Sequence, residues 1–290
     1  KLQIGKWLVV SALILNVGIH AAQAEPKYNL GIDLGLNSVS GERQSARFNE
    51  YRDISGLGLL KGNGSYTNED YYVDFKADSV ARTDQSYTLE GGKYEWGKWK
   101  FFFNKIPHNY SFNNSMFYAG GGTDTLTYTA TDRTKNKDKL FTPNVSLDVG
   151  TWNAFDYAST KTDFGTELEV STGSPFYLHL DADRVSRNGV RRGSFPSGVY
   201  LDITGAQGSS FGNVVEMPIP LDSSITNTMA EAGYRTGSVV ASASVGFSKY
   251  VDTYKTLTWR NPYITTENFN EVSWLAPDNN YMTYTGQVSV

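Results

Sequence analysis

Asp70-Tyr71-Tyr72-Val73-Asp74-Phe75-Lys76-Ala77 is the stretch that decides the fold, because apolar and charged residues alternate along it. Side chains of an extended strand point alternately to opposite sides. Tyr71, Val73, Phe75 and Ala77 therefore share one face, while Asp74 and Lys76 lie on the other. One apolar and one charged face are typical of a strand in a wall between lipid and water. The stretch predicts an all-β protein with a transmembrane antiparallel β-barrel.

The same alternation recurs along most of the chain. It is clear at residues 28–36, 70–80, 85–91, 93–105, 164–171, 176–188, 228–236, 238–251 and 281–290, and weaker at 47–53 and 56–66. Short connections between some of these segments and long ones between others are the layout of an up-and-down barrel. On the usual length of a membrane strand, we expect roughly nine to eleven strands, forming part of a larger barrel.

Three long stretches lack the alternation and are predicted to be irregular connections: residues 106–162, 191–226 and 252–280. The aromatic-rich segment 94–103 includes Trp96 and Trp99 on either side of a break at Gly97. Tryptophan and tyrosine favour the interface between bilayer and water, so this segment is predicted to be a wall strand with interfacial rings. A buried strand of a soluble sandwich is the alternative.

The first 24 residues have the pattern of a secretion signal. Lys1 and Lys6 precede an apolar run at 8–19, and an A-x-A sequence ends at Ala24. A membrane anchor would need about 20 apolar residues, whereas this run has about a dozen. We predict a signal peptide at 1–24 and one domain at 25–290. Because the sequence starts at Lys1 rather than Met and stops inside a predicted strand, we expect an N-terminal fragment of a longer chain.

Composition excludes several functional classes. The chain has no cysteine, so it can form neither a disulfide nor a thiolate metal site, and it cannot attach a c-type haem through C-x-x-C-H. Net charge is −4, and lysine and arginine are scattered, which argues against nucleic acid as a partner.

Catalytic and metal-binding patterns are weak. The three histidines, His20, His108 and His179, show no ligand spacing. The carboxylate-rich stretch 132–138 could hold Ca²⁺ weakly, but it is predicted to be a solvated loop. Glu167 and Glu169 share a strand face and could form a hydrolase pair, yet paired carboxylates are commoner on the water-filled side of a barrel. We therefore predict no enzyme and no metal site.

Eight segments occur in the order found in one family of outer-membrane proteins. They are Phe48-Asn49-Glu50-Tyr51-Arg52, residues 71–77, residues 84–92 with Leu89-Glu90-Gly91-Gly92, residues 101–108 ending in Ile106-Pro107-His108, residues 215–222, residues 232–237, residues 257–262 and residues 275–279. In this order they resemble the MtrB/PioB family of decahaem-associated outer-membrane proteins. The resemblance extends over most of residues 48–290.

The resemblance implies a barrel of more than about twenty strands in the bacterial outer membrane. Such a barrel is a porin-like sheath around a multihaem c-type cytochrome, and it supports electron transfer between periplasmic and outer-surface cytochromes. Haem is then carried by the partner, and this chain binds no cofactor. The family supplies no catalytic residues. Some members carry C-x-x-C near the mature N-terminus, which this sequence lacks.

Strand parity identifies the candidate contacts with such a partner. Charged residues on the polar faces should point into the lumen, and acids exceed bases among them. They are Asp74, Lys76, Glu90, Glu167, Glu169, His179, Asp181 and Asp183, with Asp33 on the first predicted strand. We hypothesise an acidic lumen that helps to dock the cytochrome through complementary charge.

Two other functions fit the same pattern. A general or substrate-specific diffusion porin would have the same wall around water instead of a cytochrome. A secreted all-β binding or glycan-acting protein would need a compact core between two sheets.

Overall fold

The computed structural model describes residues 26–36, 45–53, 58–128, 148–171, 173–203, 206–262, 270–275 and 279–289. The predicted signal peptide at 1–24 and the acidic stretch 132–138 lie outside the described residues. No helix in the described part of the chain is long and apolar enough to cross a membrane.

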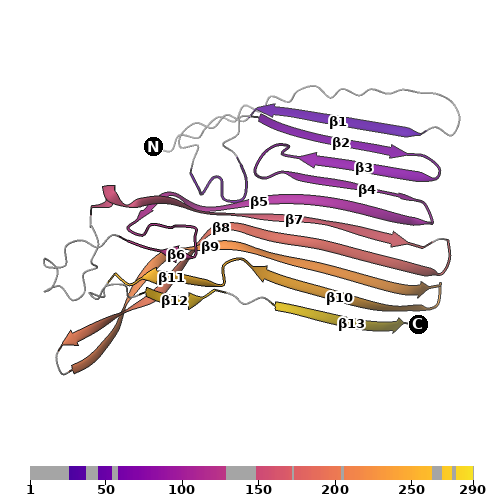
Figure 1. Ribbon diagram of the computed structural model, residues 1–290. Coiled ribbons are helices and arrows are strands. Elements are labelled where there is room, and N and C mark those ends of the chain that lie inside the picture. The colour runs from indigo at the N-terminus through magenta and orange to yellow at the C-terminus, as the bar shows by residue number, and fades with distance from the viewer. Residues whose placement is uncertain are drawn as a thin grey trace.

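Ten antiparallel strands form one large sheet, and the prediction of roughly nine to eleven spanning strands is confirmed. Each strand pairs with its neighbour in sequence except at two steps, β5–β7 and β10–β13, where strands of a small second sheet intervene (Figure 1). The strands, in sheet order, are β1 (Lys27–Leu36), β2 (Gly58–Thr67), β3 (Tyr71–Asp78), β4 (Ser86–Lys93), β5 (Gly97–Met116), β7 (Asn153–Val170), β8 (Phe176–Ile203), β9 (Ala206–Arg235), β10 (Val240–Asp252) and β13 (Asn279–Ser289).

Connections differ between the two ends of the sheet. At one end, here called the short-turn end, the strands are joined by residues 68–70, 94–96, 171–175 and 236–239. At the other, the long-loop end, the connections are 37–57, 79–85, 117–152 and 253–278, and the β8–β9 hairpin extends furthest (Figure 1). Alternation of short turns and long loops is the layout of an outer-membrane barrel.

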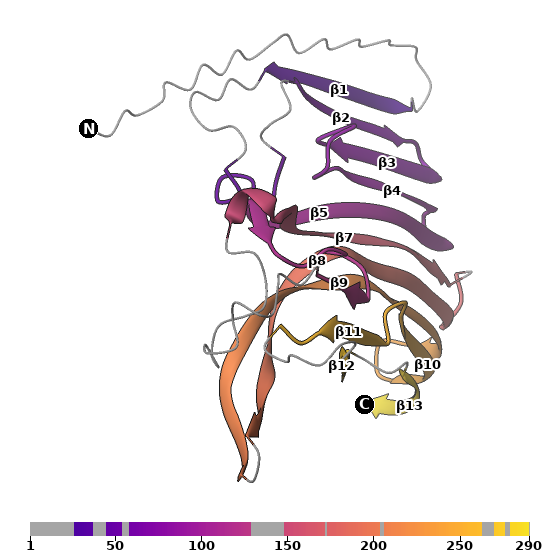
Figure 2. The same cartoon turned by 60° about the vertical axis from the view of Figure 1, so that its left-hand side comes forward.

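The sheet is a curved wall (Figure 2). Its convex face is apolar. Large apolar side chains stay exposed on every second residue of a strand, as at Leu30, Ile32 and Leu34 of β1. Their neighbours across the sheet share this face, because directly paired residues point to the same side. Leaving so much apolar surface open is unfavourable in water and favourable in lipid. The alternation predicted from residues 70–77 is thus present in the fold.

A second sheet of three short strands lies on the concave side near the long-loop end (Figure 2). It consists of β6 (Thr125–Leu126), β11 (Thr256–Arg260) and β12 (Asn270–Trp274). Its apolar face packs on β9 in the main buried core of the described residues. The buried members are Met116, Tyr118, Leu126, Tyr128, Val215, Met217, Ile219, Leu257 and Trp259. A 3₁₀ turn, η2 (Val149–Thr151), precedes β7.

Two predicted irregular stretches contain long strand segments, so those predictions were wrong for residues 106–116, 153–162, 191–203 and 206–226, whereas residues 117–152 do connect two strands of the wall. β5 continues to Met116 and β7 begins at Asn153, although residues 106–162 were expected to form a loop. β8 and β9 continue through residues 191–203 and 206–226. Pro218 and Pro220 are tolerated in β9 because its pairing with β10 ends at Ser223, leaving a neighbour on one side only.

Two further predictions also differ from the structure. Residues 47–53, read as a weak strand, form turns, in which the Asn49 side chain donates to the Ser45 carbonyl at 3.1 Å. Local hydrogen bonds of this kind compete with a strand ladder. Residues 252–280 were predicted to be a loop, but they contain β11 and β12. These two strands are too short for the alternation to be recognised.

Candidate partner-binding surface of the concave face

Cross-strand register brings most of the candidate residues into rows across the concave face. Asp74 pairs with Glu90, Glu90 with Lys100, Lys100 with Glu167, and Glu167 with Asp181. A second row runs from Lys98 through Glu169 and His179 to Glu231. This is the same face of β9 that carries Met217 and Ile219 against the small sheet, so the rows face the concave side.

We call this group the inner charge belt. It contains Asp74, Glu90, Glu167, Glu169, Asp181, Asp183 and Glu231, with Lys98, Lys100 and His179. Seven carboxylates stand beside two lysines and one histidine. Glu90, Glu167, Glu169 and His179 also line one cavity of about 190 Å³. Of the predicted candidates, Lys76 and Asp33 lie apart from the belt, and Asp33, on the edge strand β1, is paired with Lys61.

Two lysines that sequence analysis did not select neutralise part of the belt. Lys100 Nζ lies 3.1 Å from Glu167 Oε1, and Lys98 Nζ lies 3.1 Å from Glu169 Oε2. His179 Nδ1 is 4.0 Å from the same Glu169 oxygen. The signal was present, since Lys98 and Lys100 alternate with Trp99. The aromatic run at 101–103 and the break at Gly97 obscured it.

Other candidates are held by neutral or local partners. The Asn227 side chain donates to both oxygens of Asp183, at 3.2 and 3.1 Å, and Ser248 Oγ donates to Asn227 Oδ1 at 2.7 Å. Lys76 pairs with Asp78 on its own strand at 3.1 Å. Asp74, Glu90 and Asp181 form no ion pair or side-chain hydrogen bond within the described residues. These three are therefore the carboxylates most available to a partner.

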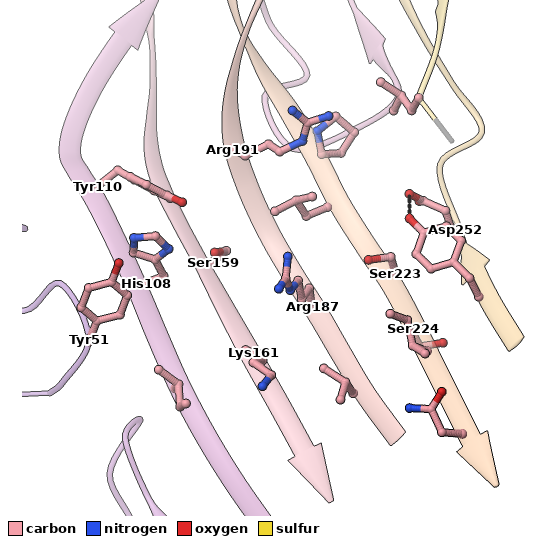
Figure 3. Close-up of a pocket in the computed structure, with 18 residues that line it drawn as sticks. Tyr51, His108, Tyr110, Ser159, Lys161, Arg187, Arg191, Ser223, Ser224 and Asp252 are labelled. Atoms are coloured by element: carbon pink, nitrogen blue, oxygen red, sulfur yellow. Dashed lines mark hydrogen bonds between the residues drawn. The ribbon is translucent and has the colours of Figure 1, made fainter. Parts of the chain in front are cut away.

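A cationic cleft lies nearer the long-loop end of the same face (Figure 3). Lys161 of β7 and Arg187 and Arg191 of β8 line this cavity of about 880 Å³. Lys161 has a carboxylate partner on its own strand, Asp163, at 3.4 Å, whereas Arg187 and Arg191 form no ion pair with any described residue. Sequence analysis missed the arginines because they fall at the end of the recognised alternation or inside the predicted irregular stretch.

Aromatic rings form one wall of the cationic cleft. The His108 ring is stacked on Tyr51, with centroids 4.5 Å apart, and its centroid lies 3.9 Å from that of Tyr110 (Figure 3). Glu50 lies 3.6 Å from His108 Nε2. On the opposite wall, Tyr250 donates to Asp252 at 2.9 Å. The cleft thus combines fixed rings with cationic side chains.

Beyond the cleft, the ends of the strands are tied together around the buried Tyr157 side chain. Burial, helped by a hydrogen bond to Glu216, raises the pKa of the Tyr157 phenol well above its ordinary value. The Arg192 guanidinium lies 5.3 Å from the centre of the Tyr157 ring and pairs with Glu216 at 3.5 Å. In the described part of the chain, no three histidine, aspartate or glutamate side chains gather as a metal site would require.

A family model described as "Putative outer membrane beta-barrel porin, MtrB/PioB" matches residues 41–290. The chain belongs to the MtrB/PioB family. No match was found among curated proteins.

Membership of the MtrB/PioB family places the wall in the bacterial outer membrane. The apolar convex face then contacts lipid, and the concave face lines the lumen. Because short turns lie on the periplasmic side of such barrels and long loops outside, the inner charge belt is near the periplasm. The cationic cleft and the small sheet are nearer the cell exterior.

Proposed function

We propose that this MtrB/PioB wall is part of a porin-like sheath that holds a multihaem c-type cytochrome and supports electron transfer across the outer membrane. The haem groups belong to the partner, because a chain without cysteine cannot attach c-type haem. The chain acts as a scaffold and insulator and performs no catalysis. Its partners are cytochromes of the periplasm and of the outer surface.

The inner charge belt is the observation that carries this proposal. Seven carboxylates are fixed on paired strands, and Asp74, Glu90 and Asp181 have no protein partner within the described residues. Carboxylates placed on rigid strands form a pre-organised surface, which costs little entropy when a partner binds. Opposite charges on the partner would steer it into the lumen and fix its orientation. Lysine-rich surfaces around a haem edge are the complementary chemistry.

A diffusion porin is the second candidate, and the cationic cleft favours it. Rings of arginine and lysine in a water-filled pore select anions. Here Arg187 and Arg191 project into the lumen without a carboxylate partner in the described part of the chain. A porin would conduct small anions and retain no cytochrome.

Co-purification with a haem-stained partner separates the two functions. The test variant replaces three unpaired belt carboxylates with lysine: Asp74→Lys, Glu90→Lys and Asp181→Lys. A charge-neutral version of the same three positions, Asp74→Asn, Glu90→Gln and Asp181→Asn, is the matched control. We expect full retention of the cytochrome in the wild type, partial retention in the neutral variant and loss in the lysine variant.

Folding is monitored in parallel by heat-modifiable migration in detergent. The sheath is supported if cytochrome retention decreases from the wild type to the neutral variant and again to the lysine variant, while all three proteins fold equally well. Equal retention by all three proteins would contradict docking through the belt. If the wild type retains no haem protein and conducts anions, the diffusion porin is correct.

A further inference from the structure

Three cations stand on the lipid-facing side within two adjacent rows of the wall. Lys105 follows Phe103 on β5, Arg184 follows Ala182 on β8, and Lys249 follows Phe247 on β10. In each case the residue two positions earlier is apolar and on the same convex face. We call Lys105, Arg184 and Lys249 the outer cationic row.

Register confirms that these residues lie side by side. Arg184 pairs with Thr226, and Thr226 pairs with Lys249, so Arg184 and Lys249 are two strands apart in one row. At about 4.8 Å between strands, their backbones are roughly 10 Å apart. Lys105 belongs to the row one step closer to the long-loop end, because it pairs with Thr162, which pairs with Ser186.

The outer cationic row lies at the upper limit of the apolar band. From Phe176 at the start of β8 to Arg184 there are eight residue steps. With about 3.4 Å per residue and a tilt of about 40°, this corresponds to a height of roughly 21 Å. An apolar barrel band is about 25 Å tall. The backbone of the row is therefore close to the outer edge of the band, from where the long cationic side chains reach the lipid headgroups on the long-loop side, which is the outer leaflet.

The surroundings of the row are polar. In the described strands β5 and β7 to β10, no carboxylate faces outward between the short-turn end and this row. Hydroxyl side chains lie between the cations, and Arg184 Nη2 donates to Ser224 Oγ at 3.2 Å. Arg184 and Lys249 are exposed, and none of the three cations has an ion pair with a described residue.

We propose that the outer cationic row binds the phosphate groups of phosphorylated glycolipid headgroups in the outer leaflet. Three positive charges without protein partners continue directly from the lipid-facing apolar surface, so acyl chains and headgroup phosphates of one lipid can be bound together. The Arg184 guanidinium suits bidentate contact with a phosphate, and the lysines supply point charges. The neighbouring hydroxyls donate hydrogen bonds to the same oxygens. This site does not depend on any cytochrome in the lumen.

Native mass spectrometry of the full-length protein in detergent tests the proposal with bisphosphorylated lipid A as the probe. The test variant is Lys105→Gln, Arg184→Gln and Lys249→Gln. The chain also offers a matched control with the same charge change on the opposite face: Lys161→Gln, Arg187→Gln and Arg191→Gln. A basic residue near an anionic membrane surface contributes about fivefold in affinity, so three predict a loss of roughly a hundredfold.

We expect this loss in the outward variant only, with lipid A affinity unchanged in the lumen variant. The wild-type protein should also bind dephosphorylated lipid A far more weakly than bisphosphorylated lipid A. Equal losses in both variants would mean attraction by net charge alone and would overturn the site. Unchanged binding in the outward variant, or equal binding of phosphorylated and dephosphorylated lipid A, would also overturn it. A conservative variant, Lys105→Arg with Lys249→Arg, should retain binding and so excludes misfolding as the cause.

Discussion

Truncating Leu257 to alanine should release the small sheet from the wall while leaving the wall intact. The Leu257 side chain is completely buried, in the core shared by β11, β6 and β9. Leu126 and Trp259 of the small sheet are buried in the same core. The strands of the small sheet are short, and β6 pairs with β11 through only two residues, Thr125 and Leu126.

The expected magnitude follows from the loss of buried methyl groups and the cavity that remains. A Leu→Ala change at a fully buried site costs about 2–5 kcal/mol. A mid-range cost of about 3 kcal/mol makes local opening of the small sheet roughly 150-fold more frequent. Hydrogen bonds to residues 118–128 limit complete release: Tyr118 donates to the Arg260 carbonyl at 2.7 Å, Tyr128 donates to the Asn261 carbonyl at 3.2 Å, and Arg260 Nη1 donates to the Tyr128 carbonyl at 3.4 Å.

Hydrogen–deuterium exchange on the full-length protein in detergent measures this effect. Peptides from β11 and β12 should exchange roughly 150-fold faster in Leu257→Ala, whereas peptides from the paired region of β7 and β8 should not change. Leu178→Ala is the control, since it removes the same atoms from a side chain that is 42% exposed on the convex face. If β11 exchanges at the wild-type rate in Leu257→Ala, the buried core does not hold the small sheet.

Three further predictions concern single interactions of the wall. A double-mutant cycle on Lys100 and Glu167, measured by denaturant titration, should give a coupling free energy below about 1 kcal/mol, because both side chains are more than one-third exposed. A larger value would show that water has less access to this ion pair than the structure indicates. Gly189→Ala should lower thermal stability by about 1–3 kcal/mol, because its φ is +139° and a Cβ would collide with the Ala158 carbonyl; an unchanged melting temperature would contradict this. Since the pKa of Tyr157 is raised in the folded state, its contribution to stability is present below pH 10 and is lost as the pH rises further. The melting temperature of Tyr157→Phe should therefore fall less steeply with pH above pH 10 than that of the wild type. An equal fall in both proteins would refute the raised pKa of Tyr157.

The sequence was sufficient to predict the membrane part of the wall. Lipid on one side and water on the other impose a strict period of two, which is visible at residues 28–36, 70–77 and 176–182. The same parity identified six of the seven carboxylates of the inner charge belt and missed Glu231. It did not identify Lys98 and Lys100, because aromatic side chains occupy both faces of the following segment.

Contacts between segments distant in sequence were beyond such reasoning. The cationic cleft is formed by side chains from five strands and the 45–53 turns, and nothing local connects Arg187 with His108 or Tyr250. The small sheet is equally non-local, since four strands of the wall, β7 to β10, lie between β6 and β11 in the sequence. Patterns of period two report which face a residue occupies, whereas these sites depend on which strands become neighbours.

The longest strands extend well beyond the bilayer, and the alternation in their sequence ends near the height at which they leave it. β8 has 28 residues, which at about 3.4 Å per residue is roughly 95 Å, far more than a bilayer requires. On β5 the recognised alternation ends at Lys105, a member of the outer cationic row, and on β8 it ends within a few residues of Arg184. Above that height both faces meet water or protein, so selection for an apolar outer face ceases while backbone pairing continues. The loss of the sequence pattern thus marks the outer boundary of the membrane on this wall, and the strands beyond it form a rim that projects from the cell surface.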